Sequence, residues 1–178
     1  IVLLAALSGL GKTRMIYETY NDGQKHPNCY YTELSDESRN KVIDSFLSLV
    51  SDIGNNEAVI IIDNCSLNLY DDIRRKIPTN IKVIFATNEY YEVTNTTNVT
   101  IIKLDSLILK KEVANYIDQN IVGQEKSTLR EEVKKIADGF PAMAYELVDT
   151  YRNGKHVRLE QAEELVTKLL KFPEDKEN

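Results

Sequence analysis

The chain begins with a short apolar run that leads straight into a glycine-rich loop and then into a helical pattern. The apolar run is IVLLA, the loop is ALSGLGKT (residues 6–13), and the helical spacing starts at KTRMIYETY (residues 12–20). A glycine-rich turn between a strand and a helix points backbone N–H groups at an anion, and the helix dipole adds positive charge there. This one feature predicts a phosphate-binding loop within an α/β fold.

Most positions of the loop have an expected part in holding a nucleotide. Gly9 and Gly11 supply the two tightest turns, because glycine lets the backbone curl without a side-chain clash. Lys12 is expected to reach the β- and γ-phosphates, and Thr13 to place its hydroxyl on Mg²⁺. Ala6 stands where the usual motif has glycine, at a strand exit that tolerates a methyl group. The predicted nucleotide-binding set is Leu7, Ser8, Gly9, Leu10, Gly11, Lys12, Thr13 and Arg14. The alternative is a glycine-rich turn with surface Lys and Arg side chains.

Apolar runs alternate with helical patterns through the first part of the chain. The expected strands are 2–6, 29–34, 58–63, 81–88 and 99–104, and the expected helices between them are 12–20, 37–53 and 67–77. The runs AVIIID and IKVIFATN are continuously apolar, as in strands that are covered on both faces. We therefore expect a five-stranded parallel sheet with helices on both faces, which forms a nucleotide-binding domain over residues 1–105.

The pattern changes after Leu104, where helical spacing alone continues. The expected helices are 107–121, 127–139, 141–154 and 159–172. Pro141 suits the first turn of a helix, and Gly139 suits a helix end. We expect a small all-α helical bundle over 106–172, followed by a linker at 173–178. The chain starts without Met inside a strand-like run, as expected for a piece of a longer protein.

Polar side chains end two of the buried strands. Asp63 ends AVIIID, and a carboxylate there suits a Mg²⁺ site, although a strand-end Asp can also cap a turn. Asn88 ends VIFATN and would lie near the γ-phosphate if its strand neighbours the loop strand; otherwise it starts a turn. The predicted metal ligands are Thr13 and Asp63, and the predicted catalytic residues include Lys12, Asp63 and Asn88.

Composition argues against some classes of partner. The net charge of −6, from 22 basic and 28 acidic residues, argues against nucleic acid, whose phosphates require a basic surface. No apolar run approaches the ~18 residues of a membrane span. The two cysteines lack a metal-ligand spacing, and together with the absence of a signal peptide they predict a cytoplasmic protein.

With these motifs in view, nearly the whole chain resembles the STAND group of P-loop ATPases, the signalling relatives of AAA+ proteins that include the NB-ARC and NACHT types. SGLGKT resembles the Walker A loop of that group, AVIIIDN its Walker B strand, and Asn88 a sensor position. GFPAMA (residues 139–144) resembles the G-x-P segment that these proteins carry in their helical domain.

The resemblance implies a function as well as a fold. It implies ATP or ADP with Mg²⁺, and a Pro141 that contacts the adenine nucleotide and couples its state to the position of the helical domain. It also implies a loop strand flanked by the strands of Asp63 and Asn88, self-oligomerisation in the ATP state, and effector and sensor domains in a longer chain. Many bacterial members of the group act in stress or anti-phage signalling.

One residue departs from the pattern of active AAA+ enzymes. These enzymes usually carry Glu after the Walker B Asp, and this chain carries Asn64. Asn cannot accept a proton as a carboxylate does, although it can orient a water. We therefore expect the chain to bind ATP or ADP tightly and to hydrolyse ATP slowly, with Asn64 as one of the catalytic residues. The alternatives are a working AAA+ ATPase, which would need that Glu and a clear arginine finger, a P-loop kinase, and a domain that holds nucleotide only as a structural cofactor. Arg74 and Arg75 are candidates for a finger, and surface arginines are the commoner interpretation.

Overall fold

The computed structural model describes residues 1–178 except 22–25, 27, 36–37, 90–97 and 154–178. Its strands are β1 (Val2–Ala5), β2 (Cys29–Glu33), β3 (Ala58–Asp63), β4 (Ile81–Thr87) and β5 (Thr100–Lys103). Its helices are α1 (Lys12–Tyr20), α2 (Arg39–Ile53), α3 (Leu67–Arg74), α4 (Ser106–Asn120), the short 3₁₀ turn η1 (Gln124–Lys126), α5 (Ser127–Ala137) and α6 (Pro141–Arg152). The predicted helix at 159–172 and linker at 173–178 lie outside the described residues.

The five strands form one parallel sheet in the order β2-β3-β4-β1-β5. The predicted α/β class and parallel sheet are confirmed. The expectation that the loop strand lies between the strands of Asp63 and Asn88 is wrong, because β1 lies between β4 and β5. β4 therefore separates β3 from β1. Asp63 still reaches the loop because the helix after β1 carries Thr13 to within 2.6 Å of its carboxylate.

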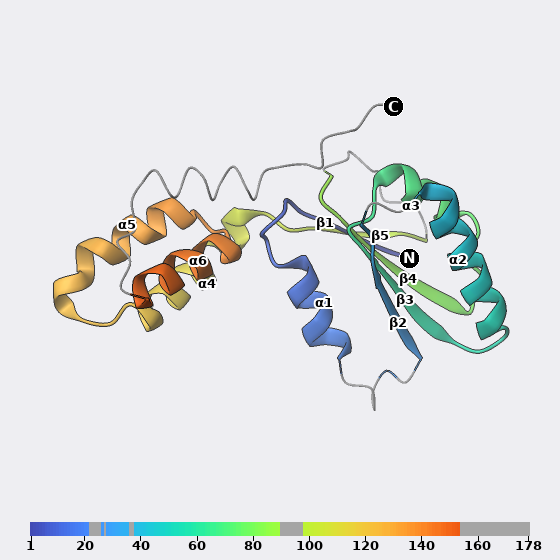
Figure 1. Ribbon diagram of the computed structural model, residues 1–178, viewed down its shortest axis with the longest axis horizontal. Helices are drawn as coiled ribbons and strands as arrows, with labels where there is room; N and C mark the ends of the chain where they lie inside the picture. Colours follow the sequence, from blue (N-terminus) through green and yellow to red (C-terminus); the bar gives the residue numbers. More distant parts are fainter. Residues whose placement is uncertain (22–25, 27, 36–37, 90–97, 154–178) are drawn as a thin grey trace. The chain divides into compact units, whose positions relative to one another are not determined.

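Helices cover both faces of the sheet (Figure 1). On one face, Phe46 of α2 and Tyr70 and Ile73 of α3 pack against Phe85 and other buried residues of the strands. On the other face, Ile16 of α1 packs against Leu4, Ile61, Ile84 and Ala86. This double cover explains why β3 and β4 are apolar along almost their whole length, since both faces of each strand leave water.

The described chain divides into two compact units. Of the described residues, the first contains those of Ile1–Leu7 and Lys12–Leu104, and the second contains Ser8–Gly11 and those of 105–153. The second unit has its own apolar core between α4, α5 and α6, formed by Val113, Ile117, Ile121, Val133, Ala137, Met143, Ala144, Leu147 and Val148. Four residues of the predicted phosphate-binding loop, Ser8–Gly11, thus group with the helices that follow the sheet.

The predicted ends of the elements differ from the observed ends by a few residues. The largest difference is α3, which ends at Arg74 where a helix to residue 77 was expected. Pro141 occupies the first turn of α6, as expected, because its missing N–H has no helical partner at that position. No helix in the described parts of the chain is long and apolar enough to cross a bilayer.

Candidate functional site

Lys12 is the buried cation at the carboxyl edge of the sheet. Its side chain comes from the first turn of α1, and the residue is 6% exposed. Its ammonium donates to the backbone oxygens of Ala6 at 2.8 Å and Leu7 at 3.2 Å, and to Asn88 Oδ1 at 2.6 Å. Burial lowers the pKa of Lys12, and the nearby Asp63 carboxylate partly offsets that effect. All three N–H groups of the ammonium are thus engaged, and an incoming phosphate would exchange with at least one of these acceptors.

Asp63 and Thr13 form a compact pair of oxygen donors. The Thr13 hydroxyl donates to Asp63 Oδ2 at 2.6 Å, and the backbone N–H of Asn64 donates to Asp63 Oδ1 at 2.8 Å. Asp63 is 3% exposed, so its carboxylate is held by the protein rather than by bulk water. A hydroxyl beside a carboxylate suits the hard oxygen chemistry of Mg²⁺, which keeps several waters and takes few protein ligands. The residues present therefore fit a Mg²⁺ ion that is shared with a nucleotide phosphate.

The side chains of Asn64 and Asn88 link the ends of three strands. Asn64 Nδ2 donates to the backbone oxygen of Leu34 at 2.9 Å, and Asn64 Oδ1 accepts from Asn88 Nδ2 at 3.0 Å. Asn88 Oδ1 in turn accepts from the Lys12 ammonium. A hydrogen-bonded chain therefore runs from the end of β2, past the ends of β3 and β4, to Lys12. Within it, Asn64 fixes which end of the Asn88 amide faces Lys12.

Tyr31 belongs to this cluster and was missed in the sequence. Its hydroxyl donates to Asp63 Oδ2 at 3.1 Å. Burial, the Asp63 carboxylate and Glu33 together raise the pKa of Tyr31 from the ordinary 10 to about 12, so the phenol remains a donor in alkaline solution as well as at neutral pH. The alternation of side chains along β2 does indicate that Tyr31 and Glu33 share one face of the sheet. The sequence does not indicate that β3 pairs with β2, and so it could not place Tyr31 beside Asp63.

The two glycines of the loop adopt a backbone conformation that favours glycine. Gly9 and Gly11 have φ values of 82° and 84°, which L side chains rarely adopt. Leu10 is buried, Leu7 is half-buried and Ser8 is exposed. Within the second unit, the backbone N–H of Ala142 donates to the Gly9 oxygen at 3.2 Å, directly after Pro141. The loop tip thus hydrogen-bonds the start of α6.

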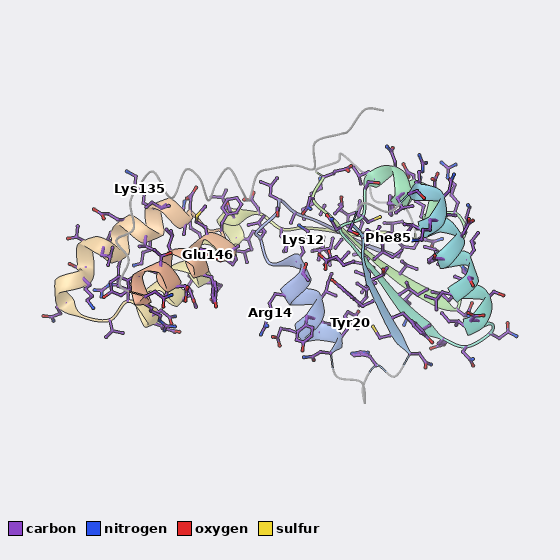
Figure 2. The ribbon with its side chains drawn as sticks, in the orientation of Figure 1. Lys12, Arg14, Tyr20, Phe85, Lys135 and Glu146 are labelled. Carbon is purple, nitrogen blue, oxygen red and sulfur yellow. The ribbon has the colours of Figure 1, made fainter. Side chains whose placement is uncertain are left out.

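The structure brings together Lys12, Thr13, Asp63, Asn64 and Asn88. Arg14 is not among them, since its guanidinium pairs with Glu18 and lies over the Tyr17 ring, with the side chain 75% exposed. Figure 2 shows Lys12 at the start of α1 and Arg14 on the outside of that helix. Arg74 pairs with Asp71 and lies over Tyr70. Among the described residues, no group of three or more His, Cys, Asp or Glu could hold a metal by itself.

Comparisons with known proteins identify no family. No model of a protein family matches the sequence, and no curated protein matches it. Among solved structures, the chain is similar to the helicase domain of Hef from Pyrococcus furiosus, with 13% sequence identity and a TM-score of 0.32. The match covers 94% of this chain and 55% of that one, so the chain spans about half the length of this neighbour. A likeness this weak carries no argument about function. The fold is an α/β fold with a five-stranded parallel sheet, consistent with a P-loop domain.

Proposed function

We propose that this chain is the nucleotide-binding and adjacent helical part of a STAND-type switch, which binds ATP or ADP with Mg²⁺ and hydrolyses ATP slowly. In this proposal, residues 1–105 hold the nucleotide and residues 106–172 form the helical domain. The bound nucleotide then determines the position of the helical domain. In the ATP-bound state, the chain self-oligomerises. Effector and sensor domains would belong to the longer chain.

The observation that carries the proposal is the meeting of four polar side chains at the carboxyl edge of the sheet. Lys12 and Thr13 follow β1, Asp63 ends β3, and Asn88 follows β4, yet hydrogen bonds of 2.6 Å join Lys12 to Asn88 and Thr13 to Asp63. Ligands of open parallel sheets bind at the carboxyl ends of the strands. A cation, a hydroxyl and a carboxylate at that edge suit a magnesium-bound phosphate chain. When bound, Mg²⁺ would neutralise charge on the phosphates, and Lys12 would hold them by charge-assisted hydrogen bonds.

Slow hydrolysis rests on Asn64. Its side chain is an amide and not a carboxylate. The amide nitrogen donates to the backbone oxygen of Leu34, and the amide oxygen accepts from Asn88. These two bonds fix the direction of the amide, so Asn64 could orient an attacking water only with its second N–H or its second lone pair. We therefore expect the isolated chain to turn over well below ~1 s⁻¹, the low end of the range for kinases. A steady-state rate at or above that value would favour the working-ATPase alternative.

The coupling to the helical domain rests on the segment around Pro141. Gly139, Phe140 and Pro141 stand at the start of α6, and the next residue, Ala142, hydrogen-bonds the loop glycine Gly9. A change of the loop on binding phosphate would alter that bond. This contact, together with the G-x-P resemblance, supports a link between nucleotide state and the helices.

Calorimetric titration tests the proposal. The chain is titrated with ATP, ADP and GTP, with Mg²⁺ and with EDTA, beside the variants Lys12→Ala and Lys111→Ala. Lys111 is an exposed lysine of α4 and provides the matched control. We expect ATP and ADP to bind, GTP to bind more weakly, and Lys12→Ala alone to weaken binding about 10- to 100-fold, the value of one or two charge-assisted hydrogen bonds. Unchanged affinity in Lys12→Ala would refute the phosphate loop, and equal affinity for GTP would refute the adenine preference.

A further inference from the structure

The Asp63 carboxylate has one side-chain donor that the phosphate-loop motif does not supply. Its Oδ1 accepts from the Asn64 N–H, and its Oδ2 accepts from two hydroxyls, those of Thr13 at 2.6 Å and Tyr31 at 3.1 Å. Thr13 is expected to turn its oxygen to the metal. The Tyr31 hydroxyl therefore fixes Oδ2 by a bond that does not depend on a metal ligand.

The strand register explains why Tyr31 reaches this carboxylate. In the parallel pair β2–β3, Tyr31 lies opposite Ile61 and Glu33 lies opposite Asp63. Residues two apart in a strand share a face, so Tyr31 and Asp63 lie on the same face of the sheet. Ile61 marks that face as the one covered by α1, since it packs with Ile16. Tyr31 sits one pleat back from the strand end, and the length of a phenol side chain brings its hydroxyl forward to Oδ2.

The neighbouring Tyr30 provides the comparison within the same strand. It lies opposite Ile60, which belongs to the core on the α2 and α3 face. Tyr30 and Tyr31 are thus consecutive, similarly exposed at 40% and 49%, and directed to opposite faces. Replacing either by Phe removes one hydroxyl and preserves the ring.

We propose that Tyr31 is a positioning residue that holds the Asp63 carboxylate in the orientation required by Mg²⁺, and so sets the metal affinity of the nucleotide site. The inference rests on the proposed nucleotide function. Second-sphere donors of this kind typically change metal affinity 10- to 100-fold when removed. Because Tyr31 is half-exposed and water can replace part of its bond, we expect the lower end, about tenfold.

The test measures ADP affinity by calorimetry across a series of free Mg²⁺ concentrations, and in EDTA, for the wild type, Tyr31→Phe and Tyr30→Phe. We expect Tyr31→Phe to need about tenfold more Mg²⁺ for half of the magnesium-dependent gain in affinity. In EDTA its ADP affinity should match the wild type, and Tyr30→Phe should match the wild type throughout. Water-proton relaxation with Mn²⁺ in place of Mg²⁺ gives the metal affinity without turnover.

Each other outcome has one meaning. If the wild type binds ADP and Tyr31→Phe shows the same magnesium dependence, the positioning role is refuted and the proposed function stands. If Tyr31→Phe weakens ADP equally in Mg²⁺ and in EDTA, the hydroxyl has a general structural role and the inference is refuted. If the wild type binds no nucleotide under any condition, the proposed function fails, and the inference fails with it.

Discussion

Asn64 has a backbone reason to be asparagine. Its φ of 57° lies in the left-handed region, where Asn is tolerated better than most L-residues. Its side chain also ties Leu34 to Asn88. A glutamate at this position would have the strain of the left-handed backbone, and it would lack the two hydrogen bonds that the asparagine side chain makes to Leu34 and Asn88. The asparagine therefore serves the geometry of the strand ends, through both its backbone and its side chain.

Two substitutions separate these contributions. Asn64→Ala and Asn64→Gly both remove the amide bonds, but only Ala meets the left-handed backbone with a Cβ atom. We expect both to lower the free energy of unfolding, and Ala to lower it by about 1 kcal/mol more than Gly. Urea denaturation followed by circular dichroism measures the difference. Equal stability of the two variants would show that the backbone at residue 64 is not strained.

Lys12 predicts a pH dependence with a definite sign. Burial lowers its pKa below the ordinary 10.5, so between the two values the unfolded chain binds more protons than the folded chain. The free energy of unfolding attributable to Lys12 therefore rises with pH in that window. We expect the wild type to gain stability relative to Lys12→Met between neutral pH and about pH 10, because other groups titrate alike in both proteins. Urea titrations at each pH test this, and a difference that stays flat or falls would contradict it.

The residues of the site differ in how far the sequence could predict them. Lys12, Thr13 and Asp63 follow from the motif and from the end of an apolar strand. Asn88 was conditional on its strand lying beside β1, and the pairing of β4 with β1 satisfies that condition. Tyr31 was missed because its role depends on the register of β2 against β3, and pairing between distant segments is not encoded in any local pattern.

At the scale of elements, Gly139 allows the end of α5 to approach the start of α4 closely. It follows Asp138, and the two have φ values of 86° and 41° at the end of α5. A Cβ on Gly139 would lie 2.1 Å from the backbone oxygen of Ser106, the first residue of α4. The glycine that the sequence suggests as a helix end thus also permits a backbone contact between two helices.

Replacing this glycine should loosen the helical unit. We expect Gly139→Ala to destabilise the helices by more than ~2 kcal/mol, since backbone strain and a clash with main chain add together. Gly54→Ala is the matched control, because φ is 59° there and the nearest atom is 4.0 Å away, which leaves the strain alone at about 1 kcal/mol. Native-state hydrogen exchange measures the loss of stability of α4–α6 in Gly139→Ala and of α2 in Gly54→Ala separately. Equal losses at the two glycines would refute the close contact.

Burial explains which strands the sequence predicted best. β3 and β4 are covered on both faces and are recognisable as apolar runs. β2 and β5 are the outer strands, largely exposed, and their order beside β3 and β1 depends on pairing over long sequence distances. The placement of the Asp63 strand beside β1, which the family resemblance implied, was wrong. Hydrophobic patterns gave no check on it, because they identify strands without ordering them.

At the scale of the whole molecule, the proposed switch depends on a loop shared by two units. Lys12 and Thr13 group with the sheet, whereas Ser8–Gly11 group with the helices, where Gly9 accepts from Ala142. In the proposed switch, a change at Gly9 on phosphate binding would act on α6 through this bond, which lies within the second unit.

Small-angle scattering tests that rearrangement. We expect the wild type to give different radii of gyration with ADP and with a slowly hydrolysed ATP analogue at low concentration, and a larger species in size-exclusion chromatography with the analogue. Lys12→Ala should abolish both differences. Pro141→Ala should keep α6, because alanine is well accepted in the first helical turn, and should reduce the differences by loosening the chain before Ala142. Identical wild-type profiles with both nucleotides, at concentrations that saturate binding, would contradict the switch while leaving nucleotide binding intact.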